Sequence, residues 1–444
     1  MSILSSLARL GLGIVLMSGL VHSQTLEAGV SRVDITPAPG LLLQGYSNPD
    51  RFATGTRDPL YARVLVLRAG ATKLALVDMD VIASLEPAYL AQLRAATYQD
   101  VTNVLVTAIH THSGPALIPT LEPPPKDWEA EAANKIAVAI HQAATHMVTA
   151  RLGVGYGVAY IGHNRLRNNH DGSVTWFETN WTGTATSPVD PTVAVLRVDD
   201  DTGSPLAILV NYACHPVIFG PDNRLYSSDF PGVMTDVVEK ALGSKVMAFF
   251  LQGADGDINP YYAVTPLSQG AVEFRQRAGT ELGVVAARVA QQIHTTADDH
   301  ASLQLTEDHL TFRPRWNAQQ WQAADPQNAK GIADKTKAQY ELPVTTLLIN
   351  QQIAFLTMPG EPFVDLQTQW RARCPVRDCF FLGYTNGYHG YFPTVRAAIW
   401  GGYGAAHPST WIEVGAGEQM LNHGLVRVYE MLGRVRATPE DLQP

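Results

Sequence analysis

Histidine, carboxylate, amide and phenol side chains gather in five short segments of this chain, and together they could bind a metal ion. The segments are His110-Thr-His112, Cys214-His215-Pro216, Asp255-Gly-Asp257-Ile-Asn259, Gly360-Glu361-Pro362 and Tyr388-His-Gly-Tyr391. Two neutral imidazoles and one carboxylate are a common zinc donor set that leaves a position open for water or substrate. Such an ion would activate water and polarise a scissile carbonyl, which is the chemistry of a metal-dependent hydrolase.

Each segment also has an ordinary structural explanation. A His-x-His pair on a strand places both rings on one face, where they can simply form hydrogen bonds. Glu361 could stabilise the N-terminus of a following helix, and Asp255 and Asp257 could form turns with their own backbone. The tyrosines could be packing residues with wetted hydroxyls. The metal hypothesis therefore depends on whether the five segments converge.

Each of the five segments follows an apolar run of strand length. The candidate strands are Arg63–Arg68, Leu74–Asp78, Asn103–Ile109, Thr192–Val198, Leu206–Tyr212, Lys245–Leu251, Thr345–Ile349, Gln352–Thr357 and Cys379–Gly383. Most are continuous runs of Val, Ile, Leu and Phe, typical of strands buried on both faces. Helical periodicity lies between them, at about 126–148, 231–238 and 269–294. The alternation predicts an α/β fold, with a mostly parallel or mixed sheet sandwiched by helices in a single large domain.

This fold class would explain how distant segments meet. Open α/β sheets bind ligands in the crevice outside the carboxyl ends of their strands. All five polar segments begin where a predicted strand ends. We therefore expect their side chains to gather around one site.

Composition restricts the classes of partner and function. The formal net charge is −9, with 46% hydrophobic and 16% charged residues, as in a densely cored globular protein. Basic runs interleaved with aromatic residues are absent, so no nucleic-acid partner is expected. Cys374 and Cys379 could form a disulfide or remain two thiols, and Cys214 is expected to be a small buried residue.

Residues 1–23 have the pattern of a secretory signal peptide. Arg9 supplies a positive charge, an apolar stretch runs from Leu10 to Val21, and Val21-His22-Ser23 resembles a cleavage site. About a dozen apolar residues are too few to span a bilayer, although a buried first helix is an alternative. We therefore expect a secreted or periplasmic protein whose mature chain covers residues 24–444.

The polar segments resemble those of the neutral/alkaline non-lysosomal ceramidases, a family of zinc-dependent hydrolases of the N-acyl bond of ceramide. The resemblance runs from about Ala28 to about Val428. It is carried by Ala28-Gly-Val-Ser-Arg-Val-Asp34-Ile-Thr-Pro37, Gly45-Tyr46, Thr107-Ala-Ile-His110-Thr-His112-Ser-Gly-Pro115, Asn164-Arg165, Asn211–Pro216, Ser227-Ser228-Asp229, Pro359-Gly-Glu361 and Asn386-Gly-Tyr388-His-Gly-Tyr391. It implies a catalytic domain over residues 24–444, without the C-terminal β-sandwich of longer members.

The resemblance also implies a site. One Zn2+ per chain would be bound by His110, His215, Glu361 and Tyr391. Tyr388 competes with Tyr391 for the last position, and Tyr391 could also donate a proton. His112 and Arg165 would lie beside the metal and bind or polarise the substrate carbonyl.

One turn departs from the family pattern. Ceramide-cleaving members have a serine in a Gly-Asp-x-Ser-Pro turn, whereas this chain reads Gly256-Asp257-Ile258-Asn259-Pro260. An amide cannot act as a nucleophile as a hydroxyl does, but Asn259 could donate a hydrogen bond to an oxyanion. We therefore expect metal-activated water to hydrolyse the N-acyl amide bond of ceramide or a related lipid or amide.

Two alternatives to this function stay open. The chain could be a related metal hydrolase that acts on a different amide or ester, or a non-catalytic periplasmic binding protein that retains the metal pocket. In each case the expected partner is a small-molecule or lipid substrate, with at most peripheral membrane contact through that substrate. A second metal near Asp255 and Asp257 is also left open by the sequence.

Overall fold

The computed structural model describes residues 24–436 except for 47, 49, 118–125, 244, 325–336 and 407. The expected signal peptide, residues 1–23, therefore lies outside the described residues. Among the described helices, none is long and apolar enough to cross a membrane.

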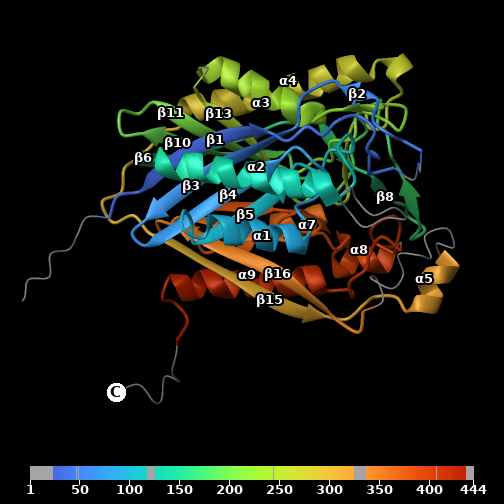
Figure 1. Ribbon diagram of the computed structural model, residues 1–444. Coiled ribbons are helices and arrows are strands. Elements are labelled where there is room, and N and C mark those ends of the chain that lie inside the picture. Colours follow the sequence, from blue (N-terminus) through green and yellow to red (C-terminus); the bar gives the residue numbers. More distant parts are fainter. Residues whose placement is uncertain are drawn as a thin grey trace, which may run out of the picture.

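An eight-stranded mixed sheet forms the larger half of the structure (Figure 1). Its order is β13 (Met247–Gln252), β11 (Pro205–Tyr212), β10 (Thr192–Asp200), β6 (Val148–Val158), β1 (Glu27–Asp34), β3 (Tyr61–Ala69), β4 (Thr72–Met79) and β5 (Asn103–Ala108). Only the pairs at its two ends, β11 with β13 and β4 with β5, are parallel. The sheet is therefore mixed, as predicted, but it is not mostly parallel, because the pairs through its centre are antiparallel.

The large sheet curves so that its two ends approach each other. The backbone N–H of Phe250 in β13 donates a hydrogen bond to the Asp78 carboxylate of β4, at 3.2 Å. Gln252, the last residue of β13, donates through Nε2 to the Ile109 carbonyl just beyond β5, at 3.0 Å. Strand ends that are far apart in the order of the sheet therefore lie side by side in space.

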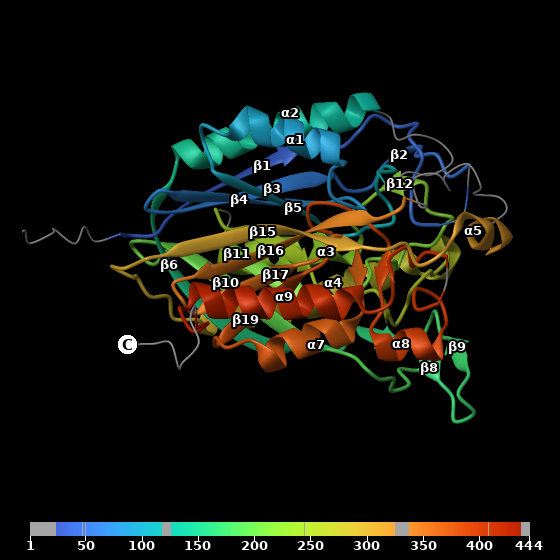
Figure 2. The same ribbon diagram turned by 90° about the horizontal axis from the view of Figure 1, so that it is seen from below.

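A second sheet packs against one face of the large sheet (Figure 2). It contains β15 (Leu303–Phe312), β16 (Tyr340–Ile349), β17 (Ile353–Thr357) and β19 (Asp378–Leu382) in that order. Apolar side chains from both sheets form one core, in which the rings of Phe355 and Phe380 stack at 4.7 Å. The two sheets are thus held together by buried apolar surface.

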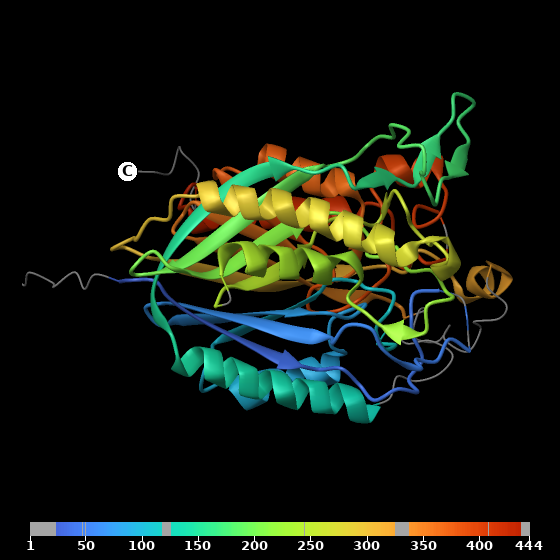
Figure 3. The ribbon, with the colours of Figure 1, turned by 90° about the horizontal axis from the view of Figure 1, so that it is seen from above.

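Helices cover the outer faces of both sheets. α1 (Pro87–Thr97) and α2 (Lys126–Thr145) lie over β1, β3 and β4, and α3 (Asp229–Leu242) and α4 (Ala271–Gln292) cover the other half of the large sheet (Figure 3). α7 (Val364–Arg373) and α9 (Ala416–Met431) cover the second sheet. The remaining elements are β2 (Gly55–Thr56), β7 (Gly162–Asn164), β8 (Leu166–Asn168), β9 (Val174–Trp176), β12 (Leu225–Tyr226), β14 (Ile258–Pro260), η1 (Leu267–Gln269), α5 (Ala318–Ala324), β18 (Glu361–Pro362), β20 (Tyr391–Phe392) and α8 (Val395–Trp400).

The predicted α/β class, with a sheet core between helices, is confirmed. Each predicted strand and helix has a counterpart whose ends differ by a few residues. The prediction missed the strands β1, β6 and β15, which carry more polar or glycine residues, and the helices α1, α7 and α9. In β6 a Cβ on Gly153 would lie 2.4 Å from the Ile293 side chain, so this strand needs glycine where the end of α4 packs directly on its backbone.

The inter-sheet core should dominate stability. We predict that Phe380→Ala lowers the free energy of unfolding by about 3–5 kcal/mol, because it leaves a cavity against Phe355. Phe52→Ala is the matched control: Phe52 is 44% exposed, whereas Phe380 is fully buried, and a surface change costs about 0.5 kcal/mol or less. Urea unfolding of the two variants and the parent measures the difference. Equal losses in both variants would contradict a single core between the sheets.

Candidate metal centre

Four segments that are distant in the sequence meet beyond the ends of strands from both sheets. His110 follows β5 and His215 follows β11. Glu361 begins β18, which pairs in parallel with β20 so that Glu361 and Tyr391 are register partners. The residues that the sequence predicts as metal ligands are therefore brought to one region of the fold.

Backbone carbonyls fix the orientation of both imidazoles. His110 Nδ1 lies 2.6 Å from the Ile82 carbonyl oxygen, and His215 Nδ1 lies 2.7 Å from that of Asp255. A carbonyl oxygen can only accept a hydrogen bond, so both Nδ1 atoms carry the proton. In the neutral form of each ring, Nε2 then presents a lone pair, as in most histidines that bind metals.

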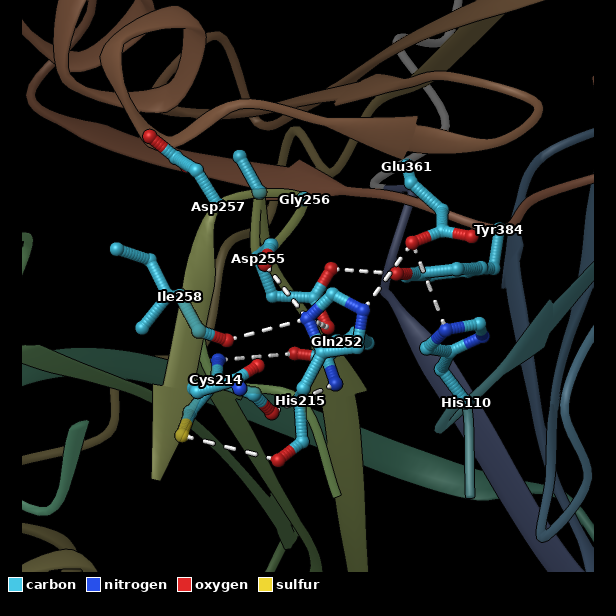
Figure 4. A network of polar contacts seen from close by, with 12 residues as sticks. His110, Cys214, His215, Gln252, Asp255, Gly256, Asp257, Ile258, Glu361 and Tyr384 are labelled. Atoms are coloured by element: carbon cyan, nitrogen blue, oxygen red, sulfur yellow. Dashed lines mark hydrogen bonds and ion pairs between the residues drawn. The ribbon is translucent and has the colours of Figure 1, made fainter. Parts of the chain in front are cut away.

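The two lone pairs face the same carboxylate oxygen (Figure 4). Glu361 Oε2 lies 3.1 Å from His215 Nε2 and 3.7 Å from His110 Nε2. Acceptors this close repel each other unless a proton or a cation lies between them. Burial lowers the pKa of His110 to about 3, so this imidazole is neutral at neutral pH. The donor set and its geometry therefore fit a cation such as zinc.

Glu361 is held in its ionised form. Burial alone would raise the pKa of its carboxyl group, but positive charge on the side of His110 and His215, together with the Tyr388 hydroxyl, outweighs burial and lowers it. With both imidazoles neutral, a bound cation would supply that charge. The Tyr388 hydroxyl donates a hydrogen bond to Oε1 and leaves Oε2 to face the imidazoles. Tyr388 therefore contacts the site through the Glu361 carboxylate.

His112 lies closer to the candidate ligands than its expected role beside the metal required. Its Nε2 is 3.3 Å from His110 Nε2, and the ligand atoms of His110, His112 and His215 all lie within 4.8 Å of one another. His112 packs tightly on Gly45, where an added Cβ would lie 2.2 Å from its ring. His112 is therefore a further candidate ligand.

Arg165 is buried beside Tyr391. Its Nη2 donates to the Tyr391 hydroxyl at 3.0 Å and to the Gly256 carbonyl at 2.7 Å. Its guanidinium carbon lies 5.0–5.6 Å from the ring centres of Trp176, Tyr391 and Tyr403. Burial, followed by the charge of Glu361, raises the pKa of Tyr391 well above its usual value. The phenol therefore stays protonated and the guanidinium is fixed in one orientation.

The Asn259 side chain is committed to its neighbours. Its Oδ1 accepts from Arg165 Nη1 at 3.1 Å, and its Nδ2 donates to the Glu178 carbonyl at 3.1 Å. Through these bonds Asn259 helps to orient Arg165.

The two aspartates of the glycine-rich turn are also engaged. The Asp257 carboxylate accepts from the Val364 N–H at 2.8 Å and from Asn164 Nδ2 at 2.6 Å. Asp255 Oδ1 accepts from the Tyr384 hydroxyl. Asp257 therefore stabilises the loop, while Asp255 contacts the histidine site.

The three cysteines, including Cys374 and Cys379, are free thiols.

Sequence reasoning missed three aromatic residues of the site. Tyr384 stands in the segment after β19, but its spacing gave no sign that it contacts His110, on which its ring stacks at 4.1 Å. Trp176 and Tyr403 surround Arg165 from the β9 hairpin and the loop after α8. Neither belongs to a recognisable motif, so only the folded structure reveals them.

Comparison with known proteins identifies related sequences and folds. The sequence model for the N-terminal part of the neutral/alkaline non-lysosomal ceramidases matches residues 26–279. The neutral ceramidase of Pseudomonas aeruginosa is 19% identical, with a TM-score of 0.74 over 95% of this chain and 76% of that one. A second structure, described as a ceramidase complexed with C2, is 17% identical, with a TM-score of 0.73 over 95% of this chain and 77% of that one.

The geometry predicts that removal of either imidazole abolishes metal binding. We expect the parent protein to retain a metal ion, with zinc the candidate, and His110→Ala and His215→Ala to lose it, because each takes away a nitrogen donor from the same ion. His423→Ala is the control, because His423 is hydrogen-bonded to Asp308, which also accepts from Arg427, and none of these residues belongs to the candidate site. Elemental analysis after dialysis, with circular dichroism as a folding check, measures the result. Full zinc content in folded His110→Ala would refute the assignment.

Proposed function

The chain belongs to the neutral/alkaline non-lysosomal ceramidase family, and on this premise we propose that it is a zinc-dependent amidohydrolase. Its substrate would be ceramide or a related lipid or amide, cleaved at the N-acyl bond. The observation that supports this most is the approach of two imidazole lone pairs to one buried carboxylate oxygen. That arrangement suits a single Zn2+ per chain.

Different residues of the site would bind the ion, stabilise negative charge and donate a proton during amide hydrolysis. His110, His215 and Glu361 would hold the ion, with His112 or Tyr391 as the further ligand. When bound, zinc would activate a water molecule and polarise the substrate carbonyl. Arg165 and His112 would stabilise the developing negative charge on that carbonyl oxygen. If it is not the further ligand, Tyr391, protonated and bonded to Arg165, would give a proton to the departing amine.

Asn259 supports a second candidate function. Its side chain occupies the turn position where ceramide-cleaving relatives are expected to have serine, and both of its polar atoms are already bonded. This observation favours a hydrolase of a different amide or ester, built on the same metal centre. A binding protein without turnover would keep the same pocket and release its ligand unchanged.

We further propose that residues 1–23 direct export, so that the enzyme works in the periplasm or outside the cell. The motivating pattern is the charged and apolar N-terminus with its small-residue cleavage site. N-terminal sequencing of the protein recovered from the exported fraction tests this: a mature chain starting near Gln24 is expected.

A substrate panel separates the candidate functions. We expect the zinc-loaded protein to release fatty acid from ceramide in detergent, and to lose this activity after chelation and regain it with added zinc. Short N-acyl amides and esters complete the panel. If ceramide is untouched while a smaller amide or ester turns over, the ceramidase function fails and the second candidate stands. If every ligand is recovered intact, the protein only binds.

Arg165 should matter for turnover more than for folding. We predict that Arg165→Lys lowers kcat by about 100-fold or more, because lysine keeps the charge but loses the planar fork that bonds Tyr391, Gly256 and Asn259. Arg167→Lys is the matched control, two residues away and exposed. Steady-state kinetics on the preferred substrate decides, and a kcat unchanged in Arg165→Lys would exclude this role.

A further inference from the structure

A buried polar pair, Asp255 and Tyr384, contacts both imidazoles and so links them. Asp255 and Tyr384 are both fully buried. The Tyr384 hydroxyl donates to Asp255 Oδ1 at 2.5 Å, and Figure 4 shows Tyr384 next to His110 and Asp255 next to His215. Two residues from different sheets, one after β13 and one after β19, are joined by this bond.

Asp255 contacts His215. Its backbone carbonyl accepts from His215 Nδ1 at 2.7 Å, and its carboxylate Oδ2 lies 3.3 Å from the same nitrogen. Oδ2 is buried and has no hydrogen-bond partner of its own. A carboxylate this close to the protonated nitrogen favours the tautomer in which Nε2 keeps its lone pair for a metal.

Tyr384 contacts the other histidine. Its ring stacks on the imidazole of His110, with centres 4.1 Å apart and planes inclined by 23°. Both residues have left-handed backbone conformations, with φ of 71° for His110 and 51° for Tyr384. Such conformations are uncommon outside glycine and persist where the surroundings enforce them. The stack therefore fixes a ring whose backbone is itself constrained.

Gln252 fixes the backbone at the same two points. Its Nε2 donates to the carbonyls of Ile109 and Cys214, the residues that precede His110 and His215, at 3.0 and 2.9 Å. The backbones and the rings of the two histidines are thus tied by separate contacts. Gln252 sets the separation of the backbones, and Asp255 with Tyr384 sets the orientation of the rings.

We propose that Asp255 and Tyr384 are positioning residues that hold His110 and His215 as one preformed half of the metal site. This inference rests on the proposed function, because it assumes that zinc binds there. Without the pair, each imidazole would have to be ordered when the ion binds, and affinity would fall. Loss of such outer contacts typically weakens metal binding by about 10–100-fold.

Zinc affinity measured by chelator competition on the folded protein tests the proposal. We expect Asp255→Asn and Tyr384→Phe each to weaken zinc binding by about 10–100-fold. The double variant should be little weaker than the poorer single variant, because both changes break one unit. Tyr226→Phe is the control: Tyr226 is also buried, but its hydroxyl bonds the Ala38 carbonyl, and its affinity should match the parent.

A cobalt spectrum separates positioning from a general loss of stability. The visible absorption of bound Co2+ depends on ligand geometry, so it should change in Tyr384→Phe and stay the same in Tyr226→Phe. Tyr384→Phe keeps the stacked ring and serves as the test if Asp255→Asn does not fold.

The outcomes are distinct. Parent-like zinc affinity and cobalt spectra in both Asp255→Asn and Tyr384→Phe, with binding lost in His215→Ala, overturn this inference and leave the proposed function standing. A parent protein that binds no zinc overturns both.

Discussion

The crowding of electron pairs between His110, His215 and Glu361 is the constraint on which the rest of the site depends. Two nitrogen lone pairs and a carboxylate oxygen meet within 4 Å in a buried place. Nothing about packing alone would bring acceptors together in this way, since burying unpaired polar groups destabilises a fold. The surrounding bonds, from carbonyls behind the rings to Tyr388 on the carboxylate, all direct these acceptors towards one point. The polar groups of the site are thus arranged as a bound cation would require.

The fold satisfies this constraint through curvature and layering. Because the large sheet bends until β13 reaches β4, the ends of β5 and β11 become neighbours. The segments that follow β17 and β19 of the second sheet then supply Glu361, Tyr384 and Tyr391. A hydrogen bond crosses between the layers at this end, from Asn211 Nδ2 in β11 to the Phe381 carbonyl in β19, at 2.9 Å. The centre is therefore built where both sheets end together.

The sequence predicted the parts of this structure that depend on local pattern. Continuous apolar runs predicted β3, β5 and β11, and the positions just after β5 and β11 identified His110 and His215 as candidate ligands. Strand β6 was not predicted, because α4 packs directly on its backbone and the glycines that this packing requires are typical of turns. The curvature of the large sheet was equally invisible, since it depends on contacts between residues such as Asp78 and Phe250 that are far apart in sequence. For the same reason the link between Asp255 and Tyr384 could not be foreseen from spacing.

Because the site is built from residues of two sheets, its geometry should be more sensitive to temperature than either sheet alone. The sheets meet through a close-packed core of Leu and Phe side chains, so the position of Glu361 relative to the histidines depends on the packing between the two layers. Ligand geometry around an ion tolerates far less displacement than an apolar contact does. Warming should therefore misalign Glu361 relative to the histidines before either layer melts. Catalytic inactivation would then begin at a temperature where the secondary structure is still intact.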